Sequence, residues 1–212
     1  TNDGYNEHFL KYRNNEGQID YASLKQDTAR EAWLVSLSSA TIPETRNGKL
    51  AFWINAYNAL TLDLIADNYP IDSIMKLDEG NVWKARKFTV GGTQVSLDEI
   101  ENNILRPMGE PRIHAAVNCA SIGCPSLLGK AFEEANLDAQ LNQAMKQWVS
   151  GNAYRFEDKK LLLNNIFTWY KVDFKENSSV DSLPEKHKEY AGIITFLLPY
   201  LSNSEQERIL AG

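Results

Sequence analysis

Residues 50–62 read Leu-Ala-Phe-Trp-Ile-Asn-Ala-Tyr-Asn-Ala-Leu-Thr-Leu and are almost all apolar. The run follows Pro43, and proline is favoured at the start of a helix, so we expect one helix that continues to about Asp67. Apolar side chains lie on nearly every side of this helix, which leaves no broad face for water. The sequence therefore predicts a buried helix at the centre of the fold.

Shorter helices are predicted upstream of the central helix. Between Tyr5 and Leu37 the apolar residues recur at helical spacing in short runs, which indicates two or three amphipathic helices. We expect residues 1–40 to form these peripheral helices and residues 41–212 to form the main part of one compact unit. No repeat, linker or low-complexity block divides the sequence.

Downstream, the sequence predicts two hairpins. Residues 87–95 hold two short β-prone runs joined by Gly91-Gly92, a pair that is typical of tight hairpin turns. Residues 154–163 hold a second pair of runs, with the turn at residues 158–160.

A helix and a strand are predicted between the two hairpins. Ser96-Leu97-Asp98-Glu99 is a capping box, which starts a helix that ends near Pro107. The apolar run from Ile113 to Asn118 reads as a short buried strand. Because the strands do not alternate with helices in a βαβ rhythm, we predict a helix-rich α+β single domain. It has a central buried helix, small antiparallel hairpins and one buried strand, and a papain-like or permuted arrangement stays open.

The composition narrows the class of protein. With 212 residues, of which 43% are hydrophobic and 24% charged, the chain is long enough to bury a core without disulfides or metal. No run approaches the roughly 20 apolar residues of a membrane span, so we expect a soluble globular protein with no transmembrane segment. A formal charge of −6 and scattered Lys and Arg argue against nucleic acid as a partner.

His114 and Cys119 are the residues best suited to chemistry. His114 lies in an apolar run just upstream of Cys119 and Cys124. A neutral imidazole can take the proton of a thiol and leave the nucleophilic thiolate. The ring would need a third group to orient it, and the available groups are Asn55, Asn58, Glu101 and Asp173. The alternative is a core histidine with satisfied hydrogen bonds.

The loop from Cys119 to Pro125 decides whether this histidine and cysteine meet. Residues five apart on a straight strand point to opposite faces, so contact between His114 and Cys119 requires a turn after about Val117. The small residues of the loop suit such a turn, and its backbone N–H groups are candidates for an oxyanion site. Alternatively, the small residues serve only close packing.

The two sulfurs allow three interpretations. Cys119 is a free nucleophile, or it forms a disulfide with Cys124 that removes the nucleophile, or the pair acts in redox chemistry. The third is the weakest, because the spacing differs from Cys-x-x-Cys. We predict no metal and no cofactor, since no second Cys or His pair has the spacing of a zinc site.

Two amides on the central helix need partners. Asn55 and Asn58 are three residues apart, share one face, and would be buried among apolar residues. Either they brace a neighbouring loop or they face a polar cleft.

Four blocks of the sequence resemble the signature blocks of the DUF547 family, and the resemblance runs from about residue 45 to residue 201. The blocks are Ala51 to Asn58, Ile100 to Arg106, His114 to Pro125 and Phe167 to Phe174. The family name declares an unknown function, so the resemblance implies a related fold and a set of shared site positions. These positions are Asn55, Tyr57, Asn58, Glu101, His114, Cys119 and Asp173.

The chain departs from the family pattern at one position. Relatives commonly have a histidine directly after the glutamate, whereas Asn102 follows Glu101 here. If that histidine is the base in relatives, activity in this chain is in doubt; if His114 is the base, nothing is lost. The second cysteine varies more readily among relatives, which favours Cys119 as the functional sulfur.

The working hypothesis is a cysteine-dependent hydrolase or acyl transferase that acts on a peptide, amide or thioester bond. Cys119 would be the nucleophile, His114 the base, and Glu101 or an Asn of the central helix the orienting group. Asn55, Tyr57, Asn58 and Asp173 would line the substrate site. The alternative is a non-catalytic binding or scaffolding domain whose polar cluster is structural.

The expected location is the periplasm or the exterior of a bacterium, although a cytoplasmic location stays open. The sequence starts at Thr1 without a methionine, which fits a removed export signal or a trimmed chain. Relatives that resemble this chain are often bacterial and exported. The expected partner is a peptide or small-molecule substrate of unknown identity, and the sequence leaves the oligomeric state open.

Overall fold

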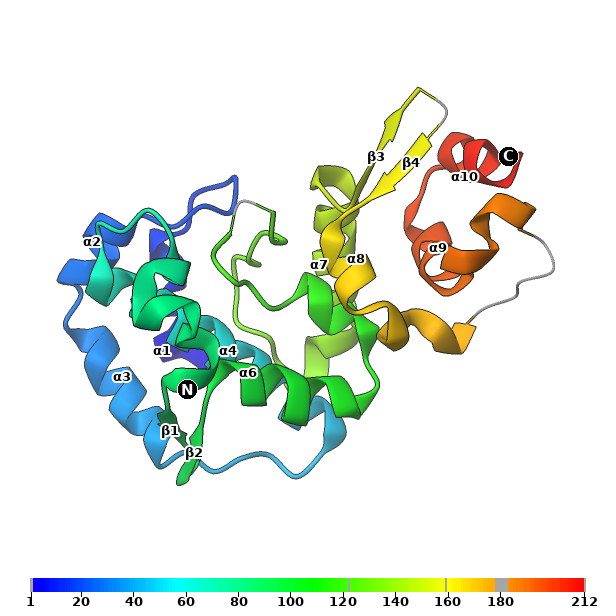
Figure 1. Ribbon diagram of the computed structural model, residues 1–212. Coiled ribbons are helices and arrows are strands. Elements are labelled where there is room, and N and C mark those ends of the chain that lie inside the picture. The colour runs from blue at the N-terminus through cyan, green and yellow to red at the C-terminus, as the bar shows by residue number, and fades with distance from the viewer. Residues whose placement is uncertain (1, 122, 159, 178–182, 212) are drawn as a thin grey trace. The chain divides into compact units, whose positions relative to one another are not determined.

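The computed structural model describes residues 2–121, 123–158, 160–177 and 183–211 (Figure 1). The chain forms two compact units, Thr1–Ala144 and Met145–Gly212. The peripheral helices predicted for residues 1–40 belong to the first unit. The helix-rich α+β class is confirmed, because helices predominate and the described strands pair into two small antiparallel sheets.

Helix α4 (Arg46–Asn68) is the predicted central helix of the first unit. Thr45 caps it, because its side chain accepts a hydrogen bond of 3.0 Å from the N–H of Gly48. Every residue from Trp53 to Leu62 is buried. The sequence pattern, apolar on nearly every side, thus corresponds to a helix that is enclosed on nearly every side.

The predicted short helices lie upstream of α4. Tyr5, Phe9 and Trp33 form an aromatic cluster, in which the ring centroids of Phe9 and Trp33 are 5.4 Å apart. This cluster packs against Ala59 and Leu62 of α4, so these helices cover one side of the central helix. The elements are α1 (Asn2–His8), the 3-10 helix η1 (Leu10–Tyr12), α2 (Tyr21–Gln26) and α3 (Ala29–Ser38).

The first predicted hairpin is confirmed. Strand β1 (Phe88–Val90) pairs antiparallel with β2 (Thr93–Val95). Gly91 and Gly92 have φ values of 56° and 79°, which glycine adopts without the penalty that a Cβ brings. The 3-10 helix η2 (Ile74–Gly80) and helix α5 (Val82–Ala85) connect α4 to this hairpin.

The predicted capping box is also present. Ser96 and Glu99 exchange hydrogen bonds between their side chains and backbone N–H groups at the start of α6 (Leu97–Glu99). The helix continues as a π-helix, η3 (Ile100–Leu105), and ends in the 3-10 helix η4 (Arg106–Met108). π-helical turns are rare in proteins, and many of those that occur lie at functional sites.

The strand predicted for residues 113–118 is wrong. The chain forms a 3-10 helix there, η5 (Pro111–Ala115), followed by a turn. Pro111 fixes the backbone at the first position, and the Glu110 side chain accepts a hydrogen bond of 3.2 Å from the N–H of Arg112. A short apolar run alone does not distinguish a strand from a buried helical turn, and these two local signals decide the outcome.

The second unit has its own aromatic core. Trp148 stacks on Phe167 at 4.5 Å, and Phe174 lies 5.2 Å from Phe167 and 5.0 Å from Phe196. The helices of this part are α8 (Asn165–Trp169), α9 (Ala191–Leu197) and α10 (Asn203–Leu210), with the 3-10 helices η7 (Lys171–Asn177), η9 (Glu185–Tyr190) and η10 (Leu198–Tyr200). The unit boundary falls within α7 (Leu137–Gly151), which follows the 3-10 helix η6 (Glu134–Asn136).

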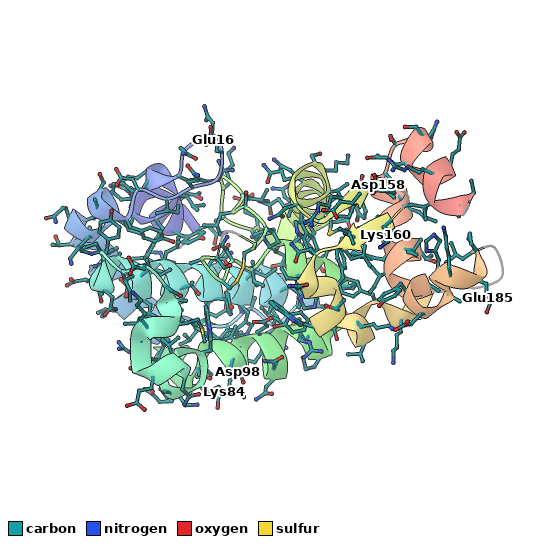
Figure 2. All side chains as sticks on the ribbon, turned by 45° about the horizontal axis from the view of Figure 1, so that its top comes forward. Glu16, Lys84, Asp98, Asp158, Lys160 and Glu185 are labelled. Atoms are coloured by element: carbon teal, nitrogen blue, oxygen red, sulfur yellow. A yellow bond between two sulfur atoms is a disulfide. The ribbon has the colours of Figure 1, made fainter. Side chains whose placement is uncertain are left out.

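The second predicted hairpin lies in this unit. Strand β3 (Tyr154–Glu157) pairs antiparallel with β4 (Lys160–Leu163). Asp158 and Lys160 flank the turn (Figure 2), as the sequence predicted, and residue 159 lies outside the described residues. No helix within the described ranges is both long and apolar enough to cross a membrane.

Candidate functional site

Asn58 joins the central helix to the chain that links His114 and Cys119. Its side-chain amide donates to the carbonyl oxygen of Ala116 at 2.9 Å and accepts from the N–H of Asn118 at 2.8 Å. Asn58 is 1% exposed, so water does not compete for these bonds. One buried side chain therefore satisfies two backbone groups and fixes the path of the chain from Ala116 to Asn118.

Asn118 continues this arrangement into the loop that carries the cysteines. Its side chain accepts from the N–H of Ala120 and donates to the carbonyl of Pro125, each at 2.7 Å. Ala120 has a φ of 57°, in the left-handed region that residues with a Cβ rarely adopt. Such a conformation persists where the surroundings hold it, and it is frequent at functional sites.

The two cysteines form a disulfide. Cys119 and Cys124 are bonded through their sulfurs, and their Cα atoms are 6.2 Å apart. Both residues are half-buried, whereas Ser121 and Gly123 between them are exposed. Cys119 is therefore not a nucleophile in the oxidised state that the structure shows. His114 is 2% exposed, in the buried helix η5.

Several backbone N–H groups of the loop, which the sequence analysis offered as oxyanion donors, already make hydrogen bonds within the protein. The N–H of Asn118 binds Asn58, that of Ala120 binds Asn118, and those of Gly123 and Cys124 bind Ser121. These four groups hold the loop in shape. They donate to a substrate only if those bonds break.

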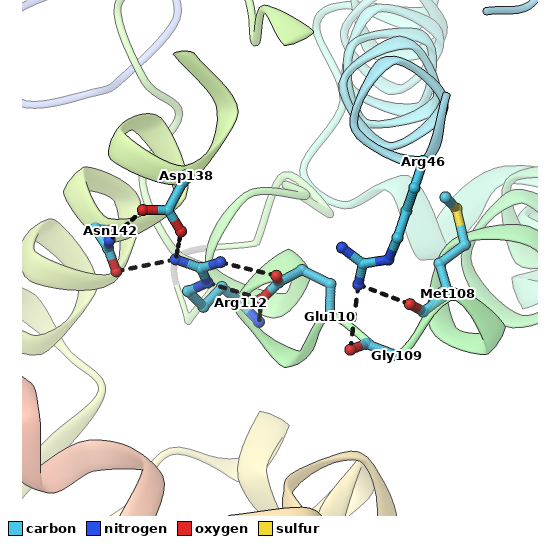
Figure 3. Close-up of polar contacts among 7 residues, drawn as sticks. All are labelled: Arg46, Met108, Gly109, Glu110, Arg112, Asp138 and Asn142. Carbon is cyan, nitrogen blue, oxygen red and sulfur yellow. Dashed lines mark hydrogen bonds and ion pairs between the residues drawn. The ribbon is translucent and has the colours of Figure 1, made fainter. Parts of the chain in front are cut away.

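Helix η5 is anchored at its start by Arg112 (Figure 3). Its guanidinium binds both carboxylate oxygens of Glu110, at 2.7 and 2.8 Å, and also reaches Asp138 at 2.7 Å and Asn142 at 3.1 Å on α7. The hydrogen bond with Glu110 is the main cause that raises the pKa of Arg112 above its ordinary value. A two-pronged contact of this kind fixes orientation as well as position.

A second arginine holds the chain just before this cluster. Arg46, the first residue of α4, donates to the carbonyl of Met108 at 2.8 Å and to that of Gly109 at 3.4 Å (Figure 3). Together with Arg112 and Asn58, it anchors residues 108–118, which we call the His114 segment, at both ends. The segment is therefore held by polar contacts to α4 and α7.

Tyr57 and Glu101, both predicted as site residues, are in contact. The Tyr57 hydroxyl donates to the Glu101 carboxylate at 3.3 Å, and its ring lies nearly parallel to that of Trp83, with centroids 6.4 Å apart. Glu101 is half-buried on the π-helix η3. Tyr57 and Asn58 are consecutive on α4, so the helix contacts both Glu101 and the His114 segment within one turn.

Asn102 takes a structural position where relatives commonly have histidine. Its side chain donates to Asp98 at 3.1 Å and accepts from Arg106 at 2.8 Å. The three residues are four apart along the same helical stretch. The amide bridges an acidic and a basic neighbour.

Asn55 braces a different loop. Its amide donates to the carbonyl of Phe132 at 2.8 Å and accepts from the N–H of Phe132 at 2.9 Å, and it also reaches Asn2 at 3.4 Å. Of the two interpretations for the asparagines of the central helix, the bracing of neighbouring loops is therefore confirmed for both Asn55 and Asn58.

Asp173 belongs to the second unit, within η7, and is half-buried there. Its share in the candidate site stays a prediction. Among residues 2–121, 123–158, 160–177 and 183–211, no three His, Cys, Asp or Glu side chains are grouped so as to hold a metal ion.

Sequence reasoning missed Asn118, Arg112 and Glu110. Asn118 carried a signal, because an asparagine before a loop of small residues often bonds the backbone two residues on. Glu110 and Arg112 lie on either side of Pro111 at the start of η5. This position would have indicated their role if a helix had been expected there.

The sequence profile of a family described as "Protein of unknown function, DUF547" covers residues 43–149. No curated protein and no solved structure matches the chain. The covered part contains Asn55, Tyr57, Asn58, Glu101, His114 and Cys119, and it ends before Asp173. The match spans half of the 212 residues and includes three of the four blocks quoted from the sequence, all except Phe167 to Phe174, so the chain belongs to the DUF547 family.

Proposed function

We propose that the chain, once its disulfide is reduced, is a cysteine-dependent hydrolase or acyl transferase. Cys119 is the nucleophile, His114 the base and Glu101 the residue that orients the base. The substrate is a peptide, an amide or a thioester. The protein acts outside the bacterial cytoplasm, and a disulfide supports that location because oxidising compartments preserve disulfides.

The anchoring of the His114 segment is the observation that carries this proposal. Catalysis needs reacting groups that are held in place before the substrate arrives. Arg112 fixes the start of η5, Asn58 fixes its end, and Asn118 fixes the loop that carries Cys119. These contacts support the proposal, because they hold the stretch of chain that carries His114 and Cys119.

The chemical steps follow from these roles. His114 takes the proton of the Cys119 thiol, and the thiolate attacks the carbonyl carbon of the substrate. The same imidazole returns the proton to the leaving amine or thiol, which departs and leaves a thioester on Cys119. Water, or an acceptor in a transfer reaction, then attacks this thioester. The N–H groups of Cys119 and Ser121 are the proposed oxyanion donors, since four other N–H groups of the loop are engaged.

A second candidate function has its own observation. In the oxidised structure Cys119 is bonded to Cys124, and the amides of Asn55 and Asn58 are satisfied by backbone groups. This arrangement favours a non-catalytic binding or scaffolding domain in which the polar cluster only specifies the fold. The two candidates differ in whether reduced Cys119 forms a covalent adduct with a substrate.

The test is adduct formation with an activated acyl substrate. Protein reduced with a phosphine, which adds no competing thiol, is mixed with p-nitrophenyl acetate, and mass spectrometry locates the acetyl group. We expect a rapid release of about one p-nitrophenol per chain and a label on Cys119. Cys119→Ala is expected to abolish both, and Cys124→Ala to keep both. An unlabelled Cys119 in the reduced wild type would overturn the hydrolase and support the binding domain.

A further inference from the structure

Two independent sets of bonds, the disulfide and the hydrogen bonds of Asn118, hold the loop around the cysteines. The disulfide joins Cys119 to Cys124, and independently the Asn118 side chain joins the N–H of Ala120 to the carbonyl of Pro125. Asn118 is in turn fixed through its own N–H by Asn58. The hydrogen bonds thus span the same stretch of chain as the disulfide.

The disulfide is therefore not needed to shape the loop. The cysteines are five residues apart, and so short a ring constrains the unfolded chain little. Asn58, which is 1% exposed, and Asn118 make bonds that do not involve either sulfur. We expect the loop to keep its conformation after reduction.

Both cysteines are partly exposed to solvent. Cys119 and Cys124 are half-buried rather than enclosed, and Ser121 and Gly123 between them are exposed. Thiol–disulfide exchange requires access to a sulfur, and a disulfide that only stabilises a core denies that access. This pair is half-buried, in a loop that we expect reduction to leave in place.

We infer that Cys119 and Cys124 form a reversible dithiol–disulfide switch that controls the candidate site. A dithiol reductant attacks one sulfur and forms a mixed disulfide, and its second thiol then displaces the protein sulfur. The reductant leaves as a cyclic or protein disulfide, and Cys119 and Cys124 gain two electrons and two protons. The control of catalysis rests on the proposed function, because only the reduced form presents the Cys119 thiol to a substrate.

The test is a redox titration of the folded protein. Samples are equilibrated with mixtures of reduced and oxidised dithiothreitol, quenched in acid and alkylated, and mass spectrometry counts the labels on Cys119 and Cys124. We expect one reversible transition from no label to two labels, with the circular dichroism spectrum unchanged. A pair that is reduced only when the protein unfolds in urea would overturn the switch.

One variant, compared with the wild type, separates the switch from the proposed function. Cys124→Ser holds Cys119 as a thiol at every redox ratio, so its acyl adduct should form without reductant, whereas the wild type should need reductant. If the wild type titrates reversibly but neither protein forms an adduct, the dithiol–disulfide site stands and the hydrolase falls. If Cys124→Ser forms the adduct while the folded wild type resists reduction, the hydrolase stands and the switch falls.

Discussion

The Oδ1 atom of Asn58, in the buried central helix, accepts a hydrogen bond of 2.8 Å from the backbone N–H of Asn118. The same amide donates to Ala116 at 2.9 Å. Through these two bonds the most enclosed element of the first unit sets the path of the chain between His114 and Cys119. The position of the candidate site thus depends directly on the core of the fold.

Replacement of Asn58 by Ala should destabilise the protein and loosen the chain from Ala116 to Asn118. The change leaves the N–H of Asn118 and the carbonyl of Ala116 without their partner, at about 1–3 kcal/mol for each unsatisfied group. The measurement is a urea unfolding curve together with hydrogen exchange of the Asn118 amide. We expect a lower free energy of unfolding and faster exchange at that amide.

Asn55→Ala is the matched control on the same helix. Asn55 makes two comparable bonds, but to Phe132. Its loss should lower stability by a similar amount and speed exchange of the Phe132 amide, while the Asn118 amide stays protected. Equal effects of both variants on both amides would show that the two asparagines do not act on separate loops.

Acid should weaken the packing of the N-terminal helices through Asp27. Burial by itself raises the pKa of Asp27, but hydrogen bonds from Lys11 and Tyr12 outweigh it and lower the pKa to about 2. A depressed carboxyl pKa contributes stability above the unfolded value of about 3.9, and this stability is lost as the pH falls toward 2. Thermal melts of wild type and Asp27→Asn between pH 5 and pH 2, in roughly half-unit steps, measure the effect.

The expected result is that wild type loses melting temperature over this range faster than Asp27→Asn. Asp72→Asn is the control, because Asp72 pairs with Lys76 on the surface, where water and salt screen the interaction. That variant should follow the wild type. Parallel curves for wild type and Asp27→Asn would contradict the assignment of acid sensitivity to Asp27.

The elements with strong local signals could be predicted from the sequence. Thirteen residues, 50–62, are almost all apolar and predict the central helix. The pair Gly91-Gly92 predicts the first hairpin. The capping box at Ser96 fixed the start of α6. In each case the pattern was long enough, or the turn chemistry specific enough, to leave one choice.

The parts that depend on tertiary partners could not be predicted in this way. The run 113–118 is short and apolar, and Pro111 and Glu110 made it a 3-10 helix rather than a strand. The sequence named Asn55 and Asn58 as amides in need of partners but could not say that Phe132 and Asn118 supply them, because those residues are more than fifty positions away. Likewise, the residues alone left the state of Cys119 open.

Gly192→Ala should destabilise the second unit. A Cβ at Gly192 would lie 2.3 Å from the carbonyl oxygen of Phe174, so α9 or η7 must shift to admit it. Overpacking of this kind costs about 1–3 kcal/mol. Gly151→Ala is the control, since Gly151 ends α7 and a Cβ there meets no atom within 4 Å. Thermal unfolding followed by circular dichroism should show a lower midpoint for Gly192→Ala and an equal or higher midpoint for Gly151→Ala. An unchanged midpoint for Gly192→Ala would refute the close approach of Gly192 to Phe174.

The most direct measurement of the central claim is the pH dependence of Cys119 alkylation by iodoacetamide in the reduced protein. It is made in the Cys124→Ser background, with and without His114→Ala, and with His114→Gln as a variant that keeps the buried volume filled. We expect that Cys119 reacts well below pH 8 and that both His114 variants, shown to be folded by circular dichroism, move the reaction to higher pH. A Cys119 that reacts like an ordinary thiol, with a midpoint near about 8.5, in all three proteins would contradict it.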